Sequence, residues 1–306
     1  MAPRAKVRDD AAVDAATREG PGLIGVLICD FEPFSAEVLK GVAAALRGTR
    51  FDLLASTGAS HHDTIGWERD SLQRFRDARV EGVIAVTPSS VISSPDLPLV
   101  VIGPLIAQTE LPSVGADEFG GAVLAVRHLV ELGHRRIALL GGRPDLESAH
   151  LREAGYRRAL AEAGIPFDPE LVGVGHYRHD ASLEPARAFL ALADPPTAVF
   201  AANDASAIAV VEVARELGVA VPERLSVVGF DDVPDAARIV PPLTTVRQPL
   251  HRVGRSAARA LMTLIGGGTL GTEHLLLRNR LVLRASTAPP ADQAVPDSDR
   301  ACRTAV

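Results

Sequence analysis

The sequence has few aromatic residues, only two cysteines and no long apolar run. Aromatic residues make up 4% of the 306 residues, so the core has to be built mainly from Ala, Val and Leu. Two distant cysteines, Cys29 and Cys302, do not make a disulfide framework, which favours a reducing compartment. No apolar run reaches the roughly 18 residues of a membrane-spanning helix, and no signal-peptide pattern precedes Gly20. We therefore expect a cytoplasmic protein without a membrane partner.

The sequence also has no excess of positive charge and no catalytic motif. A net charge of −6 gives no general attraction to nucleic acid. There is no nucleophile elbow, P-loop or HExxH motif, and the one GxGxxG pattern, at 266–271, follows a predicted helix instead of a strand. The histidines at 61–62 and 176–179 are more typical of solvated loops than of a metal site, which requires convergent ligands. We expect neither an enzyme nor a bound metal or cofactor.

Short apolar runs alternate with segments of helical periodicity along most of the chain. The runs at 23–28, 99–102 and 198–201 are typical of strands buried on both faces of a parallel sheet. The alternation predicts an α/β fold with doubly wound parallel sheets, and eight or more strands fit two lobes better than one. Residues 1–21 and 288–306 are predicted to be a disordered leader and tail.

The most informative stretch covers residues 225–249, with the sequence LSVVGFDDVPDAARIVPPLTTVRQP. It begins with a predicted strand that ends at Phe230, and Asp231 and Asp232 follow at its carboxyl end. Ligands of open α/β sheets bind beyond the carboxyl ends of the strands, where an acid pair can accept hydrogen bonds from hydroxyl groups. For one of the two acids, a cap of the next helical turn is an equally good interpretation.

This stretch resembles the LacI/GalR family of bacterial transcription regulators. The resemblance lies in a strand with Gly, an aromatic residue and Asp-Asp, followed by Pro-Pro-Leu-Thr-Thr and Gln. Further similar segments lie at 128–142, 148–160 and 200–210, and the resemblance extends over about 23–287. It implies a core of the type I periplasmic-binding-protein kind, in which three crossovers join two lobes and a ligand binds in the cleft between them.

The lobe boundaries follow from this resemblance. Residues 22–133 with 248–272 are predicted to form the N-terminal lobe, and residues 134–247 with 273–287 the C-terminal lobe. The last strand is predicted to run without a break through 275–283.

The resemblance also implies effector contacts at the ends of several strands. Asp231 is the strongest candidate. Asn203 offers both a donor and an acceptor at the end of an earlier strand, whereas Asp204 is expected to cap the helix that follows. Gln248 lies at the second crossover, and Tyr177 stands where the family often places an aromatic ring that stacks on the ligand.

Four further candidates follow the strands of the first lobe. Asp30 and Phe34 lie in the loop after the first strand, although Phe34 fits equally well as a residue packed beneath the helix. Asp117 follows another strand and fits equally well as a helix cap. Ser89 is a weaker candidate because loop serines usually bond only to the backbone.

His150 departs from the family pattern. The family commonly has Ser-Ala-Arg-x-Arg here, and the guanidinium of the first Arg grips ligand hydroxyls or a carboxylate. Residues 148–152 read Ser-Ala-His-Leu-Arg instead, and Arg152 matches the second basic position, which is expected to support the structure. His150 is therefore either a ligand contact for a different effector or an ordinary polar residue at the edge of the cleft.

Two functions are compatible with the sequence. The resemblance implies the effector-binding and dimerisation core of a regulator that senses a small polar ligand of the sugar or nucleoside class. Such regulators read operator DNA with a helix-turn-helix headpiece of about sixty residues, which the roughly 22 residues before the first core strand are too few to provide. We therefore expect a homodimer that binds DNA only through a headpiece outside this chain. The alternative is a stand-alone binding protein for a sugar-type molecule.

Overall fold

The structure is a computed structural model. It describes residues 20–58, 67–90, 92, 96–103 and 110–291. Most of the predicted leader and tail, and the histidines at 61–62, lie outside the described residues.

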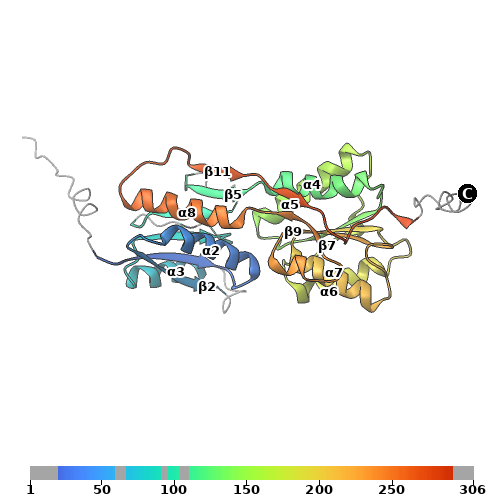
Figure 1. Cartoon of the computed structure of the whole chain (residues 1–306), viewed down its shortest axis with the longest axis horizontal. Helices are drawn as coiled ribbons and strands as arrows, with labels where there is room; N and C mark the ends of the chain where they lie inside the picture. The colour runs from blue at the N-terminus through green and yellow to red at the C-terminus, as the bar shows by residue number, and fades with distance from the viewer. Residues whose placement is uncertain (1–19, 59–66, 91, 93–95, 104–109, 292–306) are drawn as a thin grey trace, which may run out of the picture. The chain divides into compact units, whose positions relative to one another are not determined.

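The chain forms two units, each built around its own six-stranded sheet (Figure 1). Unit 1 consists of Met1–Asp117 with Pro249–Arg278, and unit 2 of Glu118–Gln248 with Asn279–Val306. The chain therefore passes from one unit to the other three times. This confirms the prediction of two doubly wound parallel-sheet lobes joined by three crossovers.

Unit 1 contains an all-parallel sheet with the strand order β11-β5-β4-β3-β1-β2. Its elements are β1 (Gly22–Ile28), α2 (Pro33–Leu46), β2 (Phe51–Thr57), α3 (Trp67–Asp77), β3 (Gly82–Val86), β4 (Leu99–Ile102), β5 (Ser113–Ala116), α8 (Leu250–Ile265) and β11 (His274–Leu277). Helices α2 and α8 cover one face of the sheet, and α3 packs on the other.

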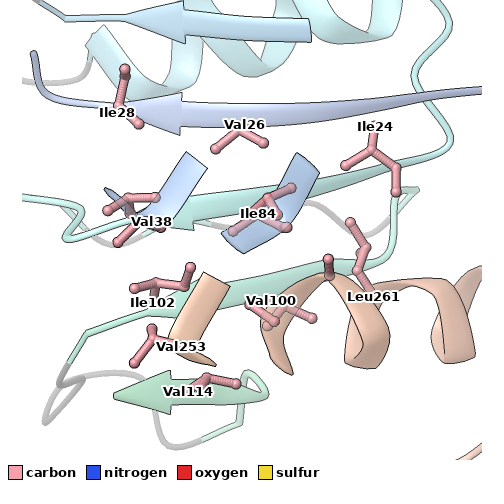
Figure 2. Close-up of a cluster of buried hydrophobic side chains, with 14 of the residues drawn as sticks. Ile24, Val26, Ile28, Val38, Ile84, Val100, Ile102, Val114, Val253 and Leu261 are labelled. Carbon is pink, nitrogen blue, oxygen red and sulfur yellow. The ribbon is translucent and has the colours of Figure 1, made fainter. Parts of the chain in front are cut away.

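The core of unit 1 follows from the alternation of side chains along its strands. Register places Val26, Ile84 and Val100 in one row across β1, β3 and β4, and all three are fully buried. Figure 2 shows these side chains in one cluster with Val253 and Leu261 of α8. The residues between them point to the opposite face, as the two-residue period of a strand requires. Both faces are apolar, which explains the continuous apolar runs in the sequence.

Helices α2 and α8 approach each other at two glycines. A Cβ atom on Gly254 would lie 2.1 Å from the carbonyl oxygen of Val38, and one on Gly41 would lie 2.3 Å from that of His251. No side chain fits at either point. The two glycines therefore set the distance at which these helices cross.

Unit 2 has the strand order β12-β10-β9-β8-β6-β7, parallel except for the antiparallel pair β10–β12. Its elements are α4 (Glu118–Glu131), β6 (Ile137–Gly141), α5 (Glu147–Glu162), η3 (Pro169–Leu171), β7 (Val172–Val174), α6 (His179–Leu190), β8 (Ala198–Ala201), α7 (Asp204–Glu216), β9 (Ser226–Asp231), η4 (Pro234–Ala237), β10 (Thr244–Arg247) and β12 (Arg280–Val282). One apolar cluster joins the sheet to α6 and α7, and another joins its opposite face to α4 and α5.

The first crossover differs from its predicted position near Gly133. The chain changes unit after Asp117, because α4 packs tightly against α5 of unit 2. A Cβ atom on Gly155 of α5 would lie 2.5 Å from the carbonyl oxygen of Phe119 of α4. The apolar stripe of α4 is compatible with either sheet, so its periodicity does not reveal which unit it joins.

The predicted single strand at 275–283 is also wrong. The chain forms β11, which pairs in parallel with β5 of unit 1, and then β12, which pairs antiparallel with β10 of unit 2. The third crossover lies between them, after Arg278. Both halves of the segment have strand-forming residues, so the division into two strands becomes evident only from the strands with which each half pairs.

Candidate functional site

Strand β9 of unit 2 ends in a turn in which two consecutive aspartates have a left-handed backbone. The φ angle is 111° at Asp231 and 61° at Asp232, a region that residues other than glycine rarely occupy. Val233, and neither acid, stands at the N-cap of η4. The interpretation of one acid as a cap is therefore wrong. Surrounding contacts have to hold such a conformation in place.

Asp204, at the start of α7, supplies those contacts from beneath the turn. Its Oδ2 accepts a hydrogen bond from the Val233 amide at 2.8 Å, and its Oδ1 accepts one from the Thr245 hydroxyl at 2.6 Å. Asp204 is fully buried. A Cβ atom on Gly229 would lie 2.3 Å from Asp204 Oδ1, so this strand position requires glycine. The cap of α7 is Asn203 and not Asp204, contrary to the prediction.

Asp232 holds the turn from the other side. Its carboxylate pairs with the guanidinium groups of Arg247 on β10 and of Arg284, the latter at 2.5 Å. Arg284 also donates to the carbonyl of Leu243 at 2.7 Å. Asp232 is thus matched by two cations and links three segments of unit 2.

Arg152 is the central cation at this edge of the sheet. Its Nε donates to Glu118 Oε2 at 2.7 Å, and Nη1 donates to the carbonyl of Ala202 at the end of β8. The guanidinium lies 3.9 Å from the centre of the Phe230 ring, and Nη2 lies 3.6 Å from Asp231 Oδ1. Arg152 is 4% exposed, so its charge is fully matched by buried partners.

The contacts of the Asp231 carboxylate within unit 2 are made through one of its two oxygens, Oδ1. Gln248 Nε2 donates to Asp231 Oδ1 at 2.7 Å, on the same side as Arg152. No donor within the described part of unit 2 is hydrogen-bonded to Oδ2. Because a carboxylate oxygen accepts up to two hydrogen bonds, Oδ2 remains able to accept from a ligand.

Asn203 and Tyr177 lie next to this group. The Asn203 side chain accepts from the Ser206 amide and donates from Nδ2 to the carbonyl of Tyr177, both at 2.9 Å. Tyr177 has a positive φ of 61°, and its hydroxyl lies 3.0 Å from Ser148 Oγ on α5. The Arg152 guanidinium lies 5.2 Å from the centre of the Tyr177 ring. The structure thus brings Tyr177, Asn203, Asp231 and Gln248 together around Arg152.

Burial favours the protonated forms of Asp204 and Asp231. Burial raises the pKa of Asp204 to about 7. It also raises the pKa of Asp231 well above its ordinary value, against the opposing effect of Arg152. Burial raises the pKa of Tyr177 to about 12, so its hydroxyl is neutral in the physiological range. For Arg152, burial acts to lower the pKa, but the charge of Glu118 raises it above its ordinary value.

His150 is not part of this group. It is exposed on α5, whereas Ser148 and Arg152, two residues away on either side, lie on the buried face. At 100° per residue, His150 points about 160° away from both. The expectation that Arg152 supports the structure agrees with its buried ion pair to Glu118.

The candidates of unit 1 are placed differently. Ser89, which follows β3, donates from its amide and its hydroxyl to Glu68 Oε1, at 3.0 and 2.7 Å. Asp30 is exposed and accepts from the amide of Phe31 at 2.7 Å. Phe34 packs against the core cluster of unit 1. This agrees with the alternative interpretation of Phe34 as a residue packed beneath the helix.

Asp117, the last residue of unit 1, immediately precedes α4, and its amide donates to the carbonyl of Leu277 at 3.0 Å. This position is compatible with both the cap and the ligand contact that the sequence left open.

Sequence reasoning missed Arg152, Glu118, Asp204 and Thr245 as members of the group in unit 2. The signal for Arg152 was present in the pattern Ser-Ala-His-Leu-Arg, because Ser148 and Arg152 are four residues apart and share one face of a helix. Glu118 gave no local signal, since its partner lies 34 residues away. Within the described residues there is no group of His, Cys, Asp or Glu that could hold a metal ion.

Comparisons with known proteins agree with this architecture. Residues 126–287 match the model of the periplasmic binding protein-like domain. The HTH-type transcriptional regulator CelR of Thermobifida fusca is 35% identical over 264 residues, which cover 83% of this chain and 76% of CelR. A solved structure of a LacI family transcriptional regulator from Mycobacterium smegmatis has a TM-score of 0.77 and 30% identity, covering 87% of this chain and 99% of that one.

The chain belongs to the LacI family of transcriptional regulators. A solved CelR–cellobiose complex resembles it as well, with a TM-score of 0.77 and 30% identity over 90% of this chain and 88% of the other. These relatives are regulators of transcription, in agreement with the expectation that the chain is not an enzyme. None of the helices in the described segments is long and apolar enough to span a membrane.

Proposed function

We propose that this chain is the effector-binding and dimerisation core of a LacI-family regulator, and that the carboxyl edge of the unit 2 sheet binds a small neutral polyol. The observation that carries the proposal is Asp231. Its carboxylate is held through Oδ1, by Gln248 and Arg152, and Oδ2 is left to accept a hydrogen bond. Tyr177 and Asn203 lie beside it and complete the proposed contacts.

The polarity of these groups favours an effector with several hydroxyl groups. Gln248 uses its amide nitrogen on Asp231, so its amide oxygen remains available as an acceptor. Asp231 Oδ2 is a second acceptor. Hydroxyl groups of a sugar or a nucleoside donate to both, and the aromatic face of Tyr177 suits the apolar side of either molecule.

An anionic effector is disfavoured by the charges of the same group. Arg152 is already bonded to Glu118 and adjacent to Asp231, and no other Arg or Lys within the described residues pairs with either acid. A phosphate or carboxylate placed next to Asp231 would meet a like charge without a free cation. We infer that phosphorylated sugars bind less well than the neutral sugars.

The sugar class and the regulatory role in the proposal are supported by relatives in the LacI family. The solved CelR structure is a complex with cellobiose, a neutral sugar, which supports the sugar class over the nucleoside class for this chain. We infer that the effector alters operator affinity by favouring one conformation of a homodimer, and that the protein acts in the cytoplasm, where the DNA lies.

A thermal-shift screen against neutral sugars, their phosphates, nucleosides and polyols tests the effector class. A ligand that binds only the native state stabilises it by about 2.7 kcal/mol at a hundredfold excess over Kd. We expect a neutral polyol to raise the melting temperature and Asp231→Asn to abolish the shift. Glu223→Gln, an exposed substitution in the same unit, is the control. Binding of phosphorylated sugars alone would contradict the proposal.

Transcript profiling separates a regulator from a stand-alone binding protein. Deletion of the gene should change the expression of a small set of operons, and the effector found in the screen should produce the same change in the wild type. Unchanged transcripts in a strain that takes up the effector would favour the stand-alone alternative.

A further inference from the structure

Asp204 is a buried acid without a cation. Its two oxygens accept from the Thr245 hydroxyl and the Val233 amide, both neutral donors, and no ion pair to it occurs within the described residues. Asp204 lies beside the end of β9, where it is bonded to the amide of Val233, two residues after Asp231, and lies against Gly229, two residues before it. Asp231 and Asp232 carry the same sign of charge as Asp204 when ionised. An isolated carboxylate in such a place is strongly disfavoured in its charged form.

The other charges around the turn are already matched. Asp232 is paired with Arg247 of β10 and with Arg284, and Glu118 of α4 is bonded to Arg152 of α5. The groups that face Asp231 come from five elements and are Glu118 of α4, Arg152 of α5, Tyr177 after β7, Asp204 of α7 and Gln248 after β10. Arg152 is therefore shared between Glu118 and Asp231, and no cation of this group remains for Asp204.

We propose that Asp204 and Asp231 hold one proton between them near neutral pH when no effector is bound, and that effector binding to Asp231 releases this proton. The inference rests on the proposed effector contact at Asp231. It adds a proton to the binding equilibrium and makes Asp204 a positioning residue, because Asp204 reaches the effector only through the turn it holds and the proton it shares.

The turn can hold the proton without losing a hydrogen bond. When Asp204 is neutral, its Oδ1 donates the proton to Thr245 Oγ1, which can also accept, and Oδ2 continues to accept from the Val233 amide. The raised pKa values of both acids, caused first by burial, agree with this arrangement.

Effector and proton compete for Asp231. An effector hydroxyl that donates to Asp231 Oδ2 requires the carboxylate, because a protonated Oδ2 is itself a donor. Binding therefore stabilises the ionised form and expels the proton. Below the pH at which the pair takes up its proton, we expect the Kd to rise by up to about tenfold per pH unit.

The first test needs no effector. Urea unfolding is measured from pH 5.5 to 8.5 for the wild type, Asp204→Asn and Asp231→Asn, with Glu223→Gln as the exposed control. The side-chain amide introduced by Asp204→Asn can accept from Val233 and donate to Thr245, so the turn is kept. An acid whose pKa is raised on folding binds more protons in the folded state, and its contribution to stability decreases as the pH rises from about 4 to about 7.

We therefore expect the wild type to lose stability relative to Asp204→Asn as the pH rises to about 7, by up to about tenfold in the unfolding equilibrium per pH unit. Asp231→Asn should show the same trend, and it serves if Asp204→Asn does not fold. A difference that stays constant with pH for both variants, as for the control, would overturn the shared proton.

The second test measures the link to binding. Calorimetric titration with the strongest binder of the polyol panel, in two buffers of different ionisation enthalpy, should show release of up to one proton near neutral pH by the wild type and less by Asp204→Asn. Binding without proton release would overturn the link. If no polyol binds, the proposed effector class fails, whereas the urea experiment still decides whether the proton is shared.

Discussion

At the scale of single residues, the site in unit 2 depends on where each charge finds its partner. Arg152 and His150 are two residues apart and both are basic, yet one is buried among acids and the other faces solvent. The resemblance to the family directed attention to position 150, whereas the helix places the side chain at position 152 in the buried group. Closeness along the sequence does not predict a shared environment here, because a helix turns by about 100° per residue and side chains two residues apart point in nearly opposite directions.

Replacing Arg152 should destabilise the protein strongly. Arg152→Met leaves Glu118 and Asp231 buried without their cation, and removal of one partner of a buried ion pair costs about 3–5 kcal/mol. Chemical denaturation of the variant measures this loss. His150→Ala, on the exposed face of the same helix, is the matched control and should change stability and effector affinity little. A mild effect of Arg152→Met would show that the pair is solvated.

Asn203 has two separable roles. Asn203→Ala removes the cap of α7 and should cost about 1 kcal/mol of stability. Asn203→Asp keeps the oxygen that accepts from Ser206 but loses the nitrogen that donates to Tyr177. We expect Asn203→Asp to retain most of the stability and to weaken effector binding, as measured by denaturation and by calorimetry. Unchanged effector affinity in Asn203→Asp would assign Asn203 to the cap alone.

At the scale of elements, two glycines determine how α2 and α8 pack in unit 1. A methyl group at Gly254 would overlap the carbonyl of Val38, and a backbone atom cannot rotate away as a side chain can. We expect Gly254→Ala to destabilise unit 1 by about 1–3 kcal/mol, although alanine favours helix formation. Urea denaturation measures the change, with Ser256→Ala on the same helix as the control. A stabilised Gly254→Ala variant would mean that the helices separate easily.

The site residues of unit 2 lie at or just after the carboxyl ends of neighbouring strands. The carboxyl end of β9 carries Asp231 and Asp232, and the neighbouring strands β8 and β10 lead to Asn203, Asp204 and Gln248. Parallel pairing places these ends at one edge of the sheet, so side chains about 45 residues apart become neighbours. The same rule predicted a ligand contact at Asp231, whereas the resemblance to the family indicated Tyr177, Asn203 and Gln248.

At the scale of the whole molecule, membership of the LacI family leads us to expect a homodimer. Light scattering after gel filtration should give a mass near twice the 32.2 kDa of the chain, about 64 kDa, at micromolar concentration. Dilution to nanomolar concentration tests how tightly the copies associate. A mass of one chain at all concentrations would contradict the dimerisation role.

The sequence by itself determined the fold class, the order of most strands and helices, and four of the residues that gather around Arg152. Apolar runs and helical periodicity reflect local geometry, and the motif around Asp231 is contiguous. Only the tertiary structure decided which unit α4 joins, where the segment at 275–283 divides, and which charges neutralise each other. These depend on contacts such as Glu118 with Arg152 and Asp204 with Thr245, whose partners lie 34 and 41 residues apart. Their energies arise from burial in a common interior, which no local pattern records.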